Sequence, residues 1–160
     1  MAMTRTLVVC RHAKSAWPDD VEDFERPLTE RGERDAPEAG RWLAERVPDI
    51  GFALCSPAKR ARRTWQLISG VTGKVETRHD KRLYGATAGE LIAVLNDVPE
   101  EAATAVLVGH NPGLEDLVAV LTGVPHQLAT TELAVLTGTG SWSQVEPGWA
   151  TLQDSAKPRG

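Results

Sequence analysis

Short apolar runs alternate along this chain with longer segments in which apolar residues recur every three or four positions. The runs predict buried strands where turn-forming residues bound them, whereas the wider spacing predicts amphipathic helices. Strands are expected at 7–10, 51–55, 74–78, 104–108 and 133–136. Helices are expected at 30–46, 57–69, 88–95 and 112–121. This alternation predicts an α/β fold, a three-layer α/β/α sandwich around a mostly parallel sheet.

The predicted helices begin with residues that favour helix N-termini. Thr29 is expected to cap the first helix, and residues 87–90, Thr-Ala-Gly-Glu, match a capping box. Ser56-Pro57 and Asn111-Pro112 each place a capping residue before a proline at the first helical position. Pro37 is expected to kink or split the first helix, because proline lacks the N–H that a helix interior uses.

The pattern changes after residue 131. Residues 133–136 and 141–145, joined by the glycine-containing segment 138–140, predict a β-hairpin whose antiparallel strands close one edge of the sheet. Beyond Pro147 the pattern is mixed, and residues 157–160 are expected to form a loose tail.

Composition narrows the class of protein. The 160 residues fit a single domain, 1–160, with its core in about residues 5–146. A net charge of −4 argues against generic attraction to nucleic acid or to an anionic membrane, so an anion site needs locally concentrated cations. The apolar runs are too short to cross a bilayer or to form a signal peptide. Cys10 and Cys55 are expected to be free and buried, which favours a cytoplasmic, reducing location.

Three of the predicted strands end in residues that suit phosphate chemistry. The first strand ends at Arg11-His12, the second is followed by Ser56 and Arg60, and the fourth ends at Gly109-His110. The carboxyl ends of parallel strands meet at one edge of a sheet, so these side chains are expected to converge. Arg60 lies in the first turn of a helix, where free N–H groups and a guanidinium can bind the same oxyanion.

Other phosphate and catalytic motifs fail on spacing. Gly73-Lys74 is followed by Val75 rather than the Ser or Thr of a phosphate-binding loop. Cys-x5-Arg would need arginine at 16 or 61, and both positions are alanine. Gly109-x-x-x-Gly113 has Asn111 where the serine of a hydrolase elbow would stand. The four scattered histidines show no metal-ligand spacing, so neither a metal nor a cofactor is expected.

The motifs together resemble a known family. Arg11-His12-Ala13, Ser56-Pro-x-x-Arg60-Ala61 with Thr64, and Gly109-His110 are similar to the signature of the histidine phosphatase superfamily, whose fold is phosphoglycerate mutase-like. That signature usually has glycine where Ala13 stands. The alanine and the segment Arg26-Pro-Leu-Thr29 resemble its short branch of SixA-type phosphohistidine phosphatases. The resemblance covers about residues 5–146.

The resemblance implies a role for each matching residue. His12 would be the nucleophile that accepts the phosphoryl group. Arg11, Arg60 and His110 would surround its oxygens, joined from the loop by Arg26. From position alone, Lys14 would either extend the anion site toward the substrate or be an exposed lysine near a strand end. Trp17 would line the mouth of the cleft.

The general acid has no clear candidate in these motifs. Larger relatives carry a glutamate in an insertion that this chain is too short to hold. Asp23, three residues before Arg26, is the leading substitute, and a solvated loop carboxylate is the alternative. Glu90 is the rival, although the capping box alone explains a glutamate there. A phosphohistidine substrate has a good leaving group, so no acid at all is a third option.

The sequence therefore predicts a metal-independent phosphatase that works through a phosphohistidine intermediate. Missing insertions imply an open site, which suits phosphohistidine in a phosphorylated protein. A small-molecule phosphomonoesterase acting on small phosphoesters is the first alternative, and a non-catalytic phosphate-binding module is the second. The oligomeric state leaves no signal in the sequence.

Overall fold

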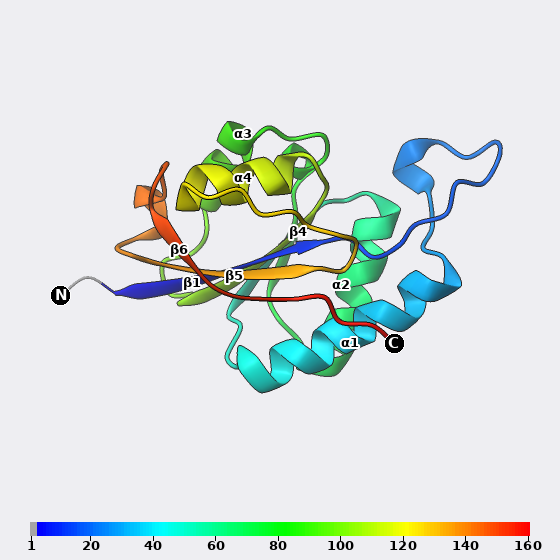
Figure 1. The fold of residues 1–160 in the computed structure, drawn as a ribbon, viewed down its shortest axis with the longest axis horizontal. Coiled ribbons are helices and arrows are strands. Elements are labelled where there is room, and N and C mark those ends of the chain that lie inside the picture. Colours follow the sequence, from blue (N-terminus) through cyan, green and yellow to red (C-terminus); the bar gives the residue numbers. More distant parts are fainter. Residues whose placement is uncertain (1–2) are drawn as a thin grey trace.

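The computed structural model describes residues 3–160 and shows a six-stranded sheet between two layers of helices (Figure 1). The strand order is β3-β2-β4-β1-β5-β6. The strands are β1 (Thr4–Arg11), β2 (Phe52–Cys55), β3 (Thr77–His79), β4 (Thr104–Gly109), β5 (Leu133–Thr139) and β6 (Ala150–Ala156). The strands β1 to β4 are parallel to one another. At one edge of the sheet, β5 pairs antiparallel with β1, and β6 pairs antiparallel with β5. The predicted α/β architecture is confirmed.

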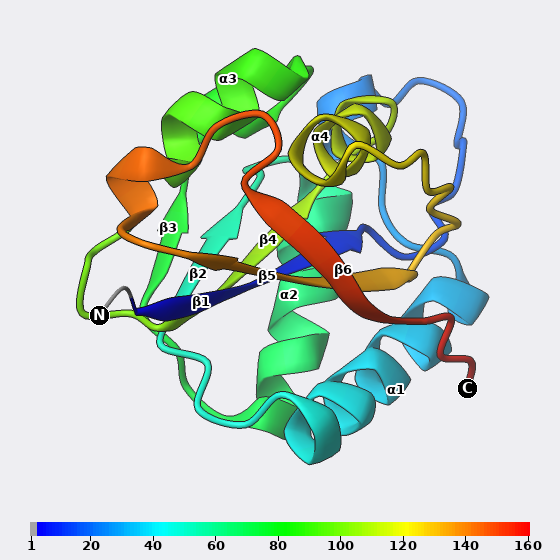
Figure 2. The ribbon, with the colours of Figure 1, turned by 60° about the vertical axis from the view of Figure 1, so that its left-hand side comes forward.

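Two helices cover each face of the sheet (Figures 1 and 2). The helices are α1 (Glu30–Arg46), α2 (Lys59–Thr72), α3 (Ala88–Leu95) and α4 (Gly113–Thr122). Three short 3-10 helices, η1 (Asp23–Glu25), η2 (Lys81–Leu83) and η3 (Trp142–Gln144), lie in the connections. The helices α1 and α2 pack on one face, and α3 and α4 pack on the other. Among the described residues, no helix has the length and apolar character that a membrane crossing requires.

The central strands are apolar throughout because both faces of the sheet are buried. Leu7 and Val9 of β1 pack toward α3 and α4, whereas Val8 and Cys10 pack toward α1 and α2. Successive side chains of a strand point to opposite faces, so a strand covered on both sides needs a continuous apolar run. Burial raises the pKa of Cys10 to about 12, so its thiol is protonated at neutral pH and unreactive.

Two of the predicted helix caps are confirmed. Thr29 Oγ1 accepts a hydrogen bond from the Gly32 N–H at 3.1 Å. Thr87 and Glu90 exchange the two hydrogen bonds of a capping box. The helix α1 is continuous through Pro37, so the expected split does not occur.

The other two predicted caps are wrong, and each helix begins later than expected. Ala58 is the N-cap of α2, and Pro112 is the N-cap of α4. The Ser56 hydroxyl lies 2.7 Å from His110 Nε2, and Asn111 Nδ2 donates to the Leu128 carbonyl at 2.8 Å. Both side chains thus make tertiary contacts at the strand ends. Ser56 Oγ also accepts a longer, local hydrogen bond from the Ala58 N–H at 3.3 Å, whereas no side chain of the described residues caps α4.

The predicted hairpin is also wrong in its second strand. Residues 141–145 contain η3, which begins with a capping box between Ser141 and Gln144 and buries Trp142. The partner of β5 is β6, and Ala150 belongs to the hydrophobic core. The core therefore continues beyond residue 146.

The expected loose tail at 157–160 instead folds back on the domain. The Gly160 N–H donates to Asp35 Oδ1 at 2.9 Å, and Arg159 donates to the Thr130 carbonyl. These contacts tie the tail to α1 and to the loop before β5. The third strand, expected at 74–78, is shorter and lies at Thr77–His79.

Candidate active site

The carboxyl ends of β1, β2 and β4 meet at one edge of the sheet. The His12 N–H donates to the Gly109 carbonyl at 3.0 Å, and the Ser56 N–H donates to the Val108 carbonyl at 3.0 Å. The loop between β1 and α1, blue in Figure 1, extends beyond this edge. A pocket of about 200 Å³ lies here. Its lining is Arg11, His12, Lys14, Ser15, Trp17, Arg26, Arg60, His110, Asn111 and Thr130.

His12 is held as a neutral imidazole with one nitrogen free. Its Nδ1 lies 2.8 Å from the Ala13 carbonyl, which can only accept a hydrogen bond, so Nδ1 carries the proton. The other nitrogen, Nε2, therefore has a lone pair. Burial, and then the nearby His110 and Arg60, lower the pKa of His12 to about 3. The ring is thus uncharged at neutral pH, as a nitrogen nucleophile must be.

Thr64 connects the end of β1 to α2. Its Oγ1 accepts a hydrogen bond from the Ala13 N–H at 2.9 Å and donates to the Arg60 carbonyl at 2.7 Å. Thr64 is fully buried, so both contacts are shielded from water. Thr64 therefore fixes the loop that carries His12 relative to the first turn of α2, which carries Arg60.

His110 lies beside His12, with their ring centroids 5.2 Å apart. Its Nε2 lies 2.7 Å from Ser56 Oγ, and the edge of Tyr84 packs on its ring. Burial, followed by the charge of Arg60, lowers the pKa of His110 to about 4. His110 Nδ1 is buried and has no hydrogen-bond partner among the described residues. In the tautomer in which Ser56 Oγ donates to Nε2, Nδ1 carries the proton and is a hydrogen-bond donor.

Three arginines supply permanent positive charge to the pocket. Arg26 and Arg60 are each 6% exposed, and Arg11 donates to the Leu128 carbonyl. Arg26 also donates to Ser15 Oγ and lies over the ring of Trp17, 3.3 Å from its centroid. Trp17 lines the mouth of the pocket and is 76% exposed.

Asp23 joins two of these arginines. Its Oδ1 accepts from Arg26 at 3.0 Å, and its Oδ2 accepts from Arg60 at 3.0 Å and from the Tyr84 hydroxyl. The Tyr84 hydrogen bond and then the two guanidinium groups hold the pKa of Asp23 well below its usual range. The carboxylate is ionised and has no proton to give in this arrangement. Its predicted role as general acid stays a prediction.

The remaining predicted residues differ in their placement. Lys14 lines the pocket with an exposed side chain. Glu90 is not among the residues that line the pocket. Its carboxylate accepts the Thr87 N–H in the capping box of α3. In the described residues, no group of three or more His, Cys, Asp or Glu side chains is arranged to hold a metal ion.

Two residues that shape the site have no such role in the sequence prediction. Asn111 is expected only to cap a helix, and no role is expected for Tyr84. Tyr84 is the only tyrosine of the chain, but the segment around it matches no motif. Its contacts with Asp23 and His110 depend on the packing of η2 beside η1, for which the sequence has no local signal.

Comparison with known proteins agrees with this geometry. The profile of the histidine phosphatase superfamily (branch 1) matches residues 7–101. An uncharacterised protein of Mycobacterium tuberculosis is 38% identical over an alignment of 160 positions, which covers 93% of this chain and 99% of that protein.

Solved structures extend the likeness to the whole fold. A protein of Nakamurella multipartitia assigned as the phosphohistidine phosphatase SixA is 32% identical, with a TM-score of 0.88 over 97% of this chain and 96% of that chain. A protein of Agrobacterium tumefaciens that is also assigned as SixA is 27% identical, with a TM-score of 0.81 over 96% of this chain and 98% of that chain. The resemblance to the SixA-type branch is confirmed. The chain belongs to the histidine phosphatase superfamily, and it is a phosphatase.

Proposed function

We propose that this phosphatase transfers a phosphoryl group to His12 and then to water, and that its substrates are proteins phosphorylated on histidine. The orientation of His12 is the observation that carries the proposal. Its Nδ1 is engaged by the Ala13 carbonyl, so Nε2 is the free nitrogen in a pocket that Arg11, Arg60 and His110 also line. A neutral nucleophile among fixed cations suits attack on a phosphoryl group, whose developing charge those cations stabilise.

The first step forms the bond between His12 Nε2 and phosphorus and breaks the bond between phosphorus and the leaving group. The guanidinium groups of Arg11, Arg26 and Arg60 bind the equatorial oxygens, and His110, which lines the same pocket, lies beside this charge. The phosphoryl oxygens replace the Asp23 carboxylate as partners of Arg26 and Arg60. A protonated imidazole leaves as neutral histidine, so a phosphohistidine substrate needs little help from an acid.

The second step releases phosphate. Water attacks phosphorus, the bond to His12 Nε2 breaks, and the proton of the water leaves with the phosphate or passes to solvent. His12 Nδ1 keeps its proton and its bond to the Ala13 carbonyl throughout, so the ring returns to the same tautomer. The backbone contact therefore prepares His12 for the next turnover.

The size of the pocket supports a protein substrate. Its volume of about 200 Å³ lies below the roughly 300–1,000 Å³ of sites that enclose small ligands. A phosphoryl group fits while its leaving group stays outside, as it would on a protein surface. The likeness to proteins assigned as phosphohistidine phosphatases points the same way.

Trapping of the intermediate tests the chemistry. The protein is mixed with labelled phosphoramidate, which has a phosphorus–nitrogen bond, and quenched in alkaline detergent, where phosphohistidine survives. We expect label on the wild type and on His79→Ala, whose histidine is exposed outside the pocket, and none on His12→Ala. Equal labelling of all three proteins would contradict His12 as the nucleophile.

A substrate panel tests the choice of substrate. We expect kcat/KM for a histidine-phosphorylated protein to exceed that for sugar phosphates and phosphoglycerates by at least about 100-fold, since only the former keeps its bulk outside the pocket. A preference for one of the metabolites would instead indicate a small-molecule phosphomonoesterase.

A further inference from the structure

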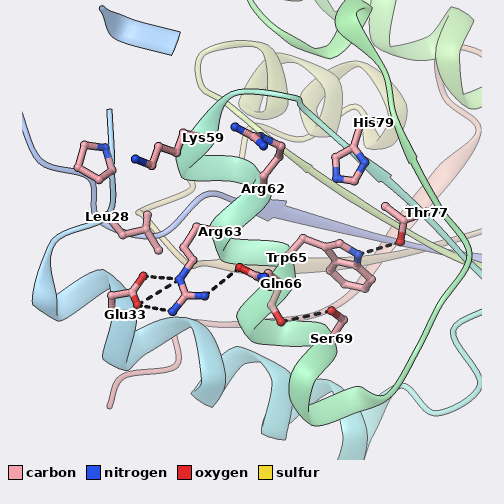
Figure 3. A pocket seen from close by; sticks show the side chains of 11 residues that line it. Leu28, Glu33, Lys59, Arg62, Arg63, Trp65, Gln66, Ser69, Thr77 and His79 are labelled. Atoms are coloured by element: carbon pink, nitrogen blue, oxygen red, sulfur yellow. Dashed lines mark hydrogen bonds and ion pairs between the residues drawn. The ribbon is translucent and has the colours of Figure 1, made fainter. Parts of the chain in front are cut away.

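A second hollow, of about 750 Å³, extends over the outer face of α2 (Figure 3). Leu28 and Glu33 bound it on one side, and Thr77 and His79 bound it on the other. We call it the α2 groove. It adjoins the catalytic pocket through consecutive residues of two segments: Arg26 and Arg60 line the pocket, whereas Pro27 and Lys59 line the groove. A substrate bound in the pocket can thus reach the groove within a few residues, at about 3.3 Å per extended residue.

The base of the groove offers apolar surface. Leu28 is half-buried, and Trp65 is 4% exposed at the edge of the core. The indole N–H of Trp65 donates to Thr77 Oγ1 at 2.9 Å, so its polar atom is already satisfied within the protein. The surface that the Trp65 ring and Leu28 offer to the groove is therefore apolar, and it suits an apolar side chain of a partner.

The rim of the groove carries unbalanced positive charge. Arg63 is paired with Glu33 at 2.7 Å, but no carboxylate of the described residues forms an ion pair with Lys59 or Arg62. Within residues 3–160, the guanidinium group of Arg62 donates to the Pro57 carbonyl and to no other group. Burial and the charge of Arg62 lower the pKa of His79, so this histidine is neutral and the positive charge of the rim comes from its lysine and arginines. Lys59 and Arg62 lie near the start of α2, the end of the helix that carries Arg60 (Figure 3).

We propose that the α2 groove docks an acidic segment of the protein that carries the phosphohistidine. The inference rests on the proposed function, and it names the chemistry of the partner. The small pocket leaves most of the substrate outside, so discrimination among phosphoproteins needs a surface beside it. Two unpaired cations over an apolar base, in a chain of net charge −4, select a segment with glutamate or aspartate near the phosphohistidine and an apolar residue between them.

Two synthetic peptides with a central phosphohistidine test this directly. One has glutamates and a leucine beside the phosphohistidine, and the other has lysines and the same leucine. We expect the wild type to hydrolyse the acidic peptide with a kcat/KM about tenfold above that of the basic peptide at low salt. The difference should lie mainly in KM and shrink as salt is added, because the rim is exposed to solvent.

A double variant reverses the charge of the groove with little change in its structure. Lys59→Glu places a carboxylate in the first turn of α2, where the helix dipole favours it. Gln66→Glu keeps an acceptor for Arg63, which donates to Gln66 Oε1. We expect this variant to lose the preference for the acidic peptide while hydrolysing phosphoramidate at the wild-type rate. The matched variant Lys74→Glu with Gln153→Glu changes net charge equally at exposed positions outside the groove and should keep the preference.

The outcomes separate the two proposals. If the wild type hydrolyses phosphoramidate and both peptides equally well, or if both double variants behave alike, the α2 groove is not the docking site although the catalysis stands. If the wild type hydrolyses phosphoramidate but neither peptide, the phosphohistidine substrate and the docking inference fail together. If it hydrolyses none of the three, the proposed chemistry fails.

Discussion

Asp23 accepts hydrogen bonds from Arg26 and Arg60, two of the three guanidinium groups that we expect to bind the phosphoryl group. Single residues thus set the electrostatics of the site, because one carboxylate offsets part of the charge of two cations until a phosphoryl group takes its place. Neutral His12 and His110 keep the pocket from accumulating still more positive charge. Each of these functions can be tested by one substitution.

Arg60→Ala should lower kcat/KM for phosphoramidate by about 100-fold or more, because it removes a buried, charged donor that we expect to bind the developing charge. Arg41→Ala removes an exposed arginine that pairs with Glu38 on α1, and it should change the rate less than twofold. Steady-state kinetics measure both. Equal losses would show that Arg60 contributes only general charge.

Asp23→Asn should lower turnover of phenyl phosphate and p-nitrophenyl phosphate by the same factor, about tenfold at most. The reason is that an ionised Asp23 positions Arg26 and Arg60 and donates no proton to the leaving group. The two substrates differ in how much they need an acid, since phenolate is the poorer leaving group. A loss confined to phenyl phosphate would instead establish Asp23 as the general acid.

Among the elements, the crossing of α1 and α2 positions the site. A Cβ at Gly40 of α1 would lie 2.8 Å from the Ile68 carbonyl of α2, so this glycine permits the close approach of the two helices. The helix α2 presents Arg60 at its start and holds the end of β1 through Thr64. The distance between α2 and the sheet therefore affects the catalytic pocket as well as the stability of the fold.

Gly40→Ala should lower the free energy of unfolding by about 1–3 kcal/mol, because the helices must move apart to admit the methyl group. Gly70→Ala is the matched substitution in α2, where nothing lies within 4 Å of the added Cβ. It should raise the free energy of unfolding by about 0.5–1 kcal/mol, since alanine favours the helix. Urea denaturation measures both, and a stabilised Gly40→Ala would contradict the close crossing.

Across the whole molecule, the burial that builds the pocket also makes stability depend on pH. His12 and His110 are neutral in the fold, with pKa values lowered from 6.5 to about 3 and about 4. In the unfolded chain each binds a proton below about pH 6.5, so acid favours the unfolded state. Their contribution is complete above pH 6.5 and is lost as the pH falls toward the folded values.

The free energy of unfolding should therefore fall between pH 7 and pH 5, by about 2 kcal/mol for each histidine. Urea denaturation at several pH values measures the slope. His12→Gln removes one of the two groups and should show about half the slope, whereas His79→Gln, an exposed position, should keep most of it. An unchanged slope in His12→Gln would show that His12 is not the buried titrating group.

Local sequence signals are enough to predict the layers of the fold and the convergence of Arg11, His12, Arg60 and His110. Continuous apolar runs require a strand covered on both faces, and parallel strands between helices bring their carboxyl ends to one edge. These signals are local, so they can be recognised without knowledge of distant contacts. The family resemblance depends on the same strand-end residues.

Other features depend on which distant segments lie side by side, and these follow from long-range packing. Ser56 contacts His110 in addition to the Ala58 N–H before α2, and Tyr84 reaches Asp23 across the site. The edge strand is β6, because residues 141–145 instead form a capped 3-10 turn that buries Trp142. A hydroxyl or an indole can satisfy local or distant partners at similar free energy, so long-range packing makes the choice.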